Sequence, residues 1–212
     1  MRRGVISSSR IHQDELQQGG QRYRVAFVTL TYRPGVDPEP RHLSAFQNHV
    51  RNWLARRGAL LRDVWVAELQ ERGAVHFHVL IFLPRGLTLP KPDKQGWWPH
   101  GFSNCKWVRR PVGYMVKYAT KTRSKGALPP GQRLWGYAGL RGTGRDHLRW
   151  WLAPQWLRGM VVPGDVLRRV GRWWENHTTG IAYRSPYELL DRVGDRLVFA
   201  PPEWTEDHVR FI

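Results

Sequence analysis

The chain has little cysteine, no phosphate-binding loop and no long apolar run. Its single cysteine, Cys105, excludes an intramolecular disulfide and a zinc site built from clustered cysteines. The sequence has no glycine-rich loop ending in Gly-Lys-Ser or Gly-Lys-Thr, so it gives no sign of a built-in ATP-driven helicase. Met1 to Gly4 are not followed by the apolar stretch of a secretory signal, and we expect a cytoplasmic protein with no membrane partner.

Acidic residues are also scarce. The 212 residues include 34 Lys and Arg but 17 Asp and Glu, which gives a formal net charge of +17. So basic a surface favours a polyanionic partner, and nucleic acid is the usual one. Arginine outnumbers lysine, which suits bidentate phosphate contacts, although a GC-rich genome produces the same bias. The hydrophobic fraction of 41% is enough for a packed core.

Hydrophobic patterns predict both strands and helices. Runs rich in β-branched and aromatic residues predict strands at 25–32, 64–70, 75–82 and 102–108, and an edge strand at 134–140. Leu43, Phe46, Val50 and Leu54 recur at helical spacing, and Gly58 follows as a C-terminal stop. A second helix is predicted at Pro111–Lys121, with proline in its first turn, and a loop at 84–99. Ser185 to Glu188 has the pattern of a capping box, which predicts a helix ending at Gly194.

The second and third strands are expected to form a hairpin that carries a candidate metal site. A short loop at 71–73 would place Glu68 opposite His76. Side chains alternate along a strand, so Glu68, His76 and His78 share one face while the other face is wholly apolar. Two imidazoles and a carboxylate can hold one ion and leave positions open for substrate and water. Gln70 lies on the same strand face as Glu68 and is the alternative polar ligand.

The predicted helix at 111–121 carries a candidate nucleophile. Tyr114, Lys117, Tyr118 and Lys121 lie along one helical face by their spacing. The opposite face, which we expect to be core, is made of Val112, Met115, Val116 and Ala119. A tyrosine oxygen can attack a phosphodiester and form a covalent ester, and nearby lysines supply positive charge for the phenolate and the phosphate.

Together these motifs resemble the HUH endonuclease superfamily. Residues 76–78 fit its histidine–hydrophobic–histidine motif, residues 114–118 fit its tyrosine motif, and residues 27–32 are similar to its first strand motif. Three further stretches resemble the rolling-circle replication initiators of plasmids and single-stranded DNA phages: 68–82, 98–101 and 135–136. The resemblance covers about residues 25 to 139.

The resemblance implies an α+β fold with a central antiparallel sheet and helices packed on it. It implies Mg²⁺ or Mn²⁺ held by Glu68, His76 and His78, in a bacterial or archaeal host. It also implies attack by a tyrosine that leaves a 5′-phosphotyrosine link and a free 3′-hydroxyl. Tyr114 is the preferred first nucleophile and Tyr118 the second, because Tyr114 comes first in the motif. The partners would be single-stranded DNA at a replication origin, in a hairpin, and the host helicase and polymerase.

The expected organisation is a flexible leader at 1–22, a nuclease domain at 23–144 and an extension at 145–212 that packs on it. DNA binding is assigned to four basic residues: Lys121, Arg109, Arg110 and Arg123. Most tryptophans are expected to be core, among them Trp97, Trp98, Trp107, Trp135, Trp150, Trp151, Trp173 and Trp174. No role is assigned to seven histidines: His12, His42, His49, His100, His147, His177 and His208.

Two other functions fit the sequence. A transposase or relaxase would use the same chemistry for different biology. A non-catalytic nucleic-acid-binding protein would keep the scaffold with a degenerate site, against which the presence of His76, His78, Tyr114 and Lys117 argues. A histidine-triad nucleotide hydrolase fits less well, because Leu80 stands where a third alternating histidine would be needed.

Overall fold

The computed structural model describes residues 1–69, 75–121, 131–194, 196–200 and 202–212. The chain divides into two compact units, Met1–Arg141 and Gly142–Ile212, which are described separately. The predicted hairpin loop at 71–73 lies outside the described residues. No helix within the described ranges has the length and apolarity needed to cross a membrane.

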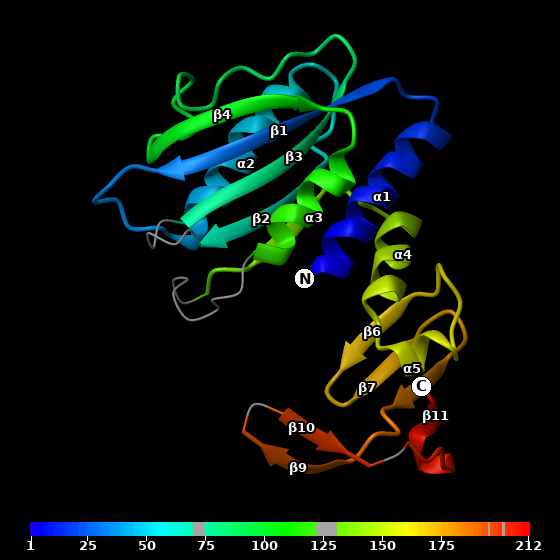
Figure 1. Cartoon of the computed structure of the whole chain (residues 1–212). Coiled ribbons are helices and arrows are strands. Elements are labelled where there is room, and N and C mark those ends of the chain that lie inside the picture. Colours follow the sequence, from blue (N-terminus) through cyan, green and yellow to red (C-terminus); the bar gives the residue numbers. More distant parts are fainter. Residues whose placement is uncertain (70–74, 122–130, 195, 201) are drawn as a thin grey trace. The chain divides into compact units, whose positions relative to one another are not determined.

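The first unit is built on a five-stranded antiparallel sheet in the order β4-β1-β3-β2-β5 (Figure 1). Its strands are β1 (Tyr23–Tyr32), β2 (Asp63–Leu69), β3 (Val75–Pro84), β4 (Gly101–Val108) and β5 (Trp135–Ala138). Each coincides within a few residues with a strand predicted from the sequence, and the predicted edge strand does lie at an edge. The predicted α+β fold with a central antiparallel sheet is confirmed.

Helix α2 (Pro40–Ala55) covers one face of this sheet (Figure 1). The four residues predicted at helical spacing, Leu43, Phe46, Val50 and Leu54, are all buried in one cluster. They pack against the apolar face of the β2–β3 hairpin, which includes Trp65, Ala67, Phe77 and Val79. This apolar layer holds the hairpin flat against α2 and leaves its other face for polar side chains.

Helices α1 (Arg2–Gln18) and α3 (Pro111–Lys121) pack on the opposite face. Val5 and Leu16 of α1 join Met115 and Ala119 of α3 in a second buried cluster. The expected flexible leader at 1–22 is therefore wrong over most of its length. The sequence hid this helix because polar Ser8 faces inward, where its hydroxyl donates to the Gly4 carbonyl at 2.7 Å.

The second unit contains a four-stranded sheet, a separate hairpin and short helices. The sheet has the order β11-β8-β7-β6, and the hairpin pairs β10 with β9. The elements are α4 (Thr143–Leu152), α5 (Gln155–Arg158), β6 (Leu167–Val170), β7 (Trp173–Asn176), β8 (Ile181–Arg184), β9 (Leu189–Val193), β10 (Arg196–Phe199), η2 (Glu206–His208) and β11 (Val209–Phe211). Leu157, Leu167 and Tyr183 form its small core.

The helix predicted from Ser185 to Gly194 is wrong, because β9 and β10 form a hairpin there. The Ser185 hydroxyl accepts a hydrogen bond from the Tyr187 amide at 3.3 Å, so it closes a local turn instead of capping a helix. Gly194 adopts φ +61°, which suits the turn between the two strands. The apolar residues that follow then pair back as a strand.

The tryptophans are less buried than expected. Of the eight named from the sequence, Trp98 is fully buried, five are half-buried, and Trp107 and Trp151 are exposed. Trp107 is covered on its ring face by the Arg24 guanidinium, which lies 3.7 Å from the ring centroid. A large aromatic ring can thus stay at the surface of this basic protein by stacking with arginine.

The packing of α1 is testable by truncating one of its buried side chains. Leu16→Ala should lower the free energy of unfolding by about 2–5 kcal/mol, because Leu16 is buried against the sheet. The exposed neighbour Gln17 is the matched control, and Gln17→Ala should change stability by less than about 0.5 kcal/mol. Urea unfolding measures both variants. Equal stability of the two would show that the first helix is not part of the fold.

A second prediction concerns acid stability. Burial, together with the nearby Arg62 guanidinium, lowers the pKa of His12 from 6.5 to about 3. The unfolded chain therefore takes up a proton that the folded chain refuses, and the free energy of unfolding falls as the pH decreases from 6.5 towards 3. His12→Gln should reduce this slope by up to about 1.4 kcal/mol per pH unit. Urea titrations from pH 4 to 7 with identical slopes would contradict it.

Candidate functional site

The β2–β3 pairing brings the three predicted ligand residues to one place. Glu68 is the direct cross-strand partner of His76, as the sequence predicts, and Val66 is that of His78. The Glu68 carboxylate oxygen Oε2 lies 2.6 Å from Nε2 of His78, and both side chains are buried. Gln70, the alternative ligand, lies outside the described residues. Glu68 therefore makes the contact with a histidine that the hairpin register requires of it.

Two threonines of β1 contact the other edge of the imidazoles. The Thr29 hydroxyl lies 3.2 Å from Nδ1 of His78, and the Thr31 hydroxyl lies 3.4 Å from Nδ1 of His76. These contacts follow from the strand register, in which Thr29 pairs with His78 and Thr31 with His76. The sequence analysis missed both threonines. Their alternation in the first strand was the signal, because residues two apart on a strand share a face.

The environment favours a neutral His76. Burial lowers the pKa of His76 from 6.5, and the nearby Glu68 carboxylate opposes this in part. His76 is therefore uncharged at neutral pH, and a neutral imidazole is the form that binds metal ions. The threonine contacts at Nδ1 are of the kind that orient a ligating histidine, whose other nitrogen, Nε2, is turned towards an ion.

The donor types fit a divalent cation, but the arrangement is open. The ring centroids of His76 and His78 are 6.4 Å apart. In the part of the chain that the structure describes, no three His, Cys, Asp or Glu side chains are gathered closely enough to hold a metal ion. Two imidazole nitrogens and one carboxylate nevertheless match the ligand chemistry of Mn²⁺ and, through the carboxylate, of Mg²⁺.

Helix α3 places both predicted tyrosines beside His78. Its buried residues Met115 and Ala119 anchor it on the sheet. The Tyr118 ring stacks on the His78 ring with a centroid distance of 3.8 Å and an interplanar angle of 30°. The Tyr114 ring meets Phe27 edge-on at 4.7 Å, and 40% of Tyr114 is exposed. The helix thus brings two phenols to the face of the sheet that carries the histidines.

The phenol of Tyr118 is held in its protonated form. Burial raises the pKa of Tyr118 above its usual value, and the neighbouring Tyr114 and the Glu68 carboxylate raise it further. A nucleophilic phenolate at this position therefore needs a positive charge to form at neutral pH. Lys117 is exposed on the same helix, one residue before Tyr118.

The predicted DNA-binding residues are only partly described. Arg109 and Arg110 are exposed and lie between β4 and α3. Lys121 is the last residue of α3, although its side chain is not described. Arg123 lies outside the described residues. The two arginines therefore lead from the sheet edge directly into the helix that carries the tyrosines.

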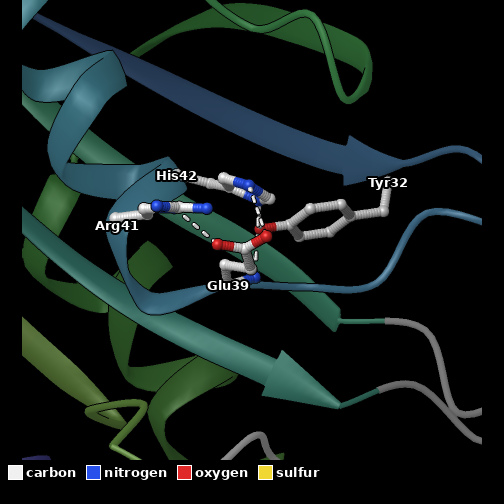
Figure 2. A network of polar contacts seen from close by, with 4 residues as sticks. All are labelled: Tyr32, Glu39, Arg41 and His42. Carbon is white, nitrogen blue, oxygen red and sulfur yellow. Dashed lines mark hydrogen bonds and ion pairs between the residues drawn. The ribbon is translucent and has the colours of Figure 1, made fainter.

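A polar network missed by the sequence analysis supports the end of β1 from the other face of the sheet (Figure 2). The Tyr32 hydroxyl lies 3.2 Å from Nδ1 of His42, and Glu39 forms an ion pair with Arg41 at 2.5 Å. Burial raises the pKa of Tyr32 to about 12, so its hydroxyl stays protonated and available as a donor. Tyr32 follows Thr31 directly, so this network fixes the strand at the point where it contacts His76.

Two histidines without an assigned role belong to the same region. The His100 ring stacks on the His42 ring with a centroid distance of 3.6 Å. The His100 carbonyl accepts a hydrogen bond from the Arg33 amide at 3.0 Å, and the Trp98 indole donates to the Thr31 carbonyl at 3.1 Å. The stretch 98–101, noted in the sequence for its resemblance to initiators, thus braces the end of β1 structurally.

Comparison with known proteins identifies the segment that carries this site. Residues 25–123 match a family model whose members are described as replication-associated proteins of the ORF2 type. This segment contains the threonines, the histidines, Glu68 and both tyrosines. The match supports a Rep-type rolling-circle replication initiator and confirms the resemblance drawn from the motifs. No curated protein and no solved structure matched the chain.

The environment of Tyr118 makes a prediction that spectroscopy can test. Its phenol should ionise at higher pH than an exposed tyrosine, because burial and neighbouring groups disfavour the phenolate. Carbon-13 NMR of ring-labelled tyrosine, titrated from pH 8 to 12 and assigned with Tyr118→Phe, measures this directly. Glu68→Gln should move the midpoint of Tyr118 downwards. A midpoint at the usual value would show that the ring is not packed as described.

Proposed function

Because residues 25–123 match a family of replication-associated proteins, we propose that the chain is a metal-dependent single-stranded DNA endonuclease and strand-joining enzyme. It would start rolling-circle replication by cutting one strand at the origin through a 5′-phosphotyrosine intermediate. The observation that carries the proposal is the stack of Tyr118 on His78, with Tyr114 beside it across Phe27. Two nucleophile candidates and two ligand candidates share one small surface.

The proposed step exchanges one phosphodiester for another. The tyrosine oxygen attacks the scissile phosphorus and loses its proton, while the bond from phosphorus to the 3′-oxygen breaks and that oxygen leaves as a hydroxyl. The 5′-phosphate is then bonded to the tyrosine, and the 3′-hydroxyl is a primer for the host polymerase. Because no bond energy is lost to water, a later attack by a hydroxyl on the phosphotyrosine rejoins the strand.

The two tyrosines suit two successive transfers. Tyr114 is the candidate for the first attack, because its ring is partly exposed and touches Phe27 only by its edge. Tyr118 is packed flat between Phe27 and His78, with centroid distances of 5.3 and 3.8 Å. It is the candidate for the second transfer, which cuts the newly made strand and allows the displaced strand to close.

Glu68, His76 and His78 would hold Mg²⁺ or Mn²⁺. A divalent ion bound there would polarise the scissile phosphate and stabilise the charge that develops on it. Thr29 and Thr31 orient the imidazoles through their Nδ1 atoms. Lys117, exposed on α3, supplies positive charge to the phosphate or the phenolate. Arg109, Arg110, Lys121 and Arg123 would bind the flanking backbone of a single-stranded origin presented by a hairpin.

A covalent adduct tests the proposal. Wild-type protein is incubated with Mn²⁺ and single-stranded oligonucleotides that together cover both strands of the replicon encoding it, and the products are separated on a denaturing gel. One oligonucleotide should be cut and should leave its 3′ portion attached to the protein, and EDTA should prevent this. Absence of any adduct across the whole set would overturn the proposed chemistry.

Variants then assign the residues. Tyr114→Phe with Tyr118→Phe should abolish the adduct, whereas Tyr137→Phe, a half-buried tyrosine on β5, should leave it unchanged. His76→Ala should abolish cleavage but change the dissociation constant for the same oligonucleotide by less than about threefold, since phosphate contacts supply most of the affinity. An adduct that survives in the double tyrosine variant would place the nucleophile elsewhere.

A further inference from the structure

The edge strand β4 lies on the site side of β1 with its residues in register with the candidate site. Phe102 pairs with Thr31, Asn104 with Thr29, and Lys106 with Phe27. On its other side, β1 pairs Thr31 with His76 and Thr29 with His78. Residues that face each other across neighbouring strands point to the same side of a sheet. Phe102, Asn104 and Lys106 therefore lie on the face that carries the histidines.

The side chains of this strip, defined as Phe102, Asn104 and Lys106, are turned to solvent. Phe102 is 65% exposed, and Asn104 and Lys106 are also exposed. Ser103, between the first two, is buried on the other face. Successive members are roughly 6.6 Å apart along the strand, a step that one nucleotide of an extended strand can span. The order is an aromatic ring, an amide and an ammonium group.

Protection of the sheet edge explains only part of the strip. A lysine on an edge strand discourages pairing with another chain, which accounts for Lys106. An exposed phenylalanine has the opposite effect, since it adds apolar surface to the same edge. Within the described residues, no aromatic ring or guanidinium stacks on Phe102, whereas Arg24 covers the exposed Trp107 on the same strand. Phe102 thus presents an open ring face next to His76.

We propose that this strip binds the single-stranded DNA substrate beside the site. A base stacks on Phe102, Asn104 hydrogen-bonds a base edge, and Lys106 contacts a phosphate. Arg109 and Arg110 follow on the same strand end and extend the positive charge towards α3. A single strand is the fitting partner, because its bases are free to stack on a ring, and the net charge of +17 favours a polyanion over a protein. The role of the bound strand as a substrate rests on the proposed function, but the binding does not.

Affinity for a fixed single strand tests the ring. A fluorescein-labelled 20-nucleotide thymidine oligomer is titrated with protein in EDTA, where cleavage cannot occur, and binding is followed by anisotropy. Phe102→Ala should weaken binding by about 5- to 150-fold, the range for losing one base–aromatic stack, and Phe102→Trp should restore it. Phe211→Ala is the matched control, since Phe211 is 86% exposed but lies in the second unit. Circular dichroism checks that each variant is folded.

The salt dependence of the same titration tests the lysine. Lys106→Ala should lower the slope of log affinity against log salt by about 0.7, the value for one phosphate contact on a single strand. Lys94→Ala removes an exposed lysine from the loop before β4 and should leave the slope unchanged if the contact is specific. Equal slopes for Lys106→Ala and wild type would remove Lys106 from the strip.

The outcomes separate this proposal from the proposed function. Wild-type affinity in folded Phe102→Ala, or an equal loss in Phe211→Ala, overturns the strip whether or not the covalent adduct forms. Loss of binding in Phe102→Ala that Phe102→Trp reverses supports the strip. If that result comes with no adduct from wild-type protein, the strip stands as a DNA-binding surface and the nicking chemistry fails.

Discussion

The register of β3 between its two neighbours is the constraint on which the candidate site depends. Pairing with β2 sets Glu68 beside His78, and pairing with β1 sets the two threonine hydroxyls at the Nδ1 atoms. A slip of one residue would turn both imidazoles into the apolar layer under α2 and bring Phe77 to the polar face. Burying two polar rings there and exposing a phenylalanine would be costly, so the hydrophobic layer enforces the geometry of the polar one.

The helices divide the labour of holding this sheet. Helix α2 fills one face with leucine, valine and phenylalanine, and the sheet can therefore present its other face with little distortion. Helix α3 covers only part of that second face, since Met115 and Ala119 are buried while Tyr114 is partly exposed. Helix α1 packs behind it through Val5 and Leu16. The tyrosines are consequently carried on a helix that is fixed from two sides yet open at its phenols.

The sequence predicted what is local and periodic. Alternation along 64–70 and 75–82 was enough to place Glu68 opposite His76, and helical spacing was enough to bury Met115 and Ala119. It failed where a polar residue faces inward, as Ser8 does in α1, and where Ser185 satisfies a turn instead of a helix. The stacking of His42 on His100 joins residues far apart in the chain, so no spacing could announce it. Which atoms the threonines contact likewise required the register of three strands.

The position of β4 at the border of its sheet also bears on the solubility of the protein without DNA. The outer backbone amides and carbonyls of such a strand are open to pairing with another copy, and exposed Phe102 adds apolar attraction to that contact. Long-range repulsion between molecules of charge +17 opposes it, but at about 0.15 M salt this repulsion is screened beyond roughly 8 Å. Short-range repulsion between facing copies of Lys106 persists after screening. One lysine beside one phenylalanine therefore lets the same border attract a polyanion and resist self-association.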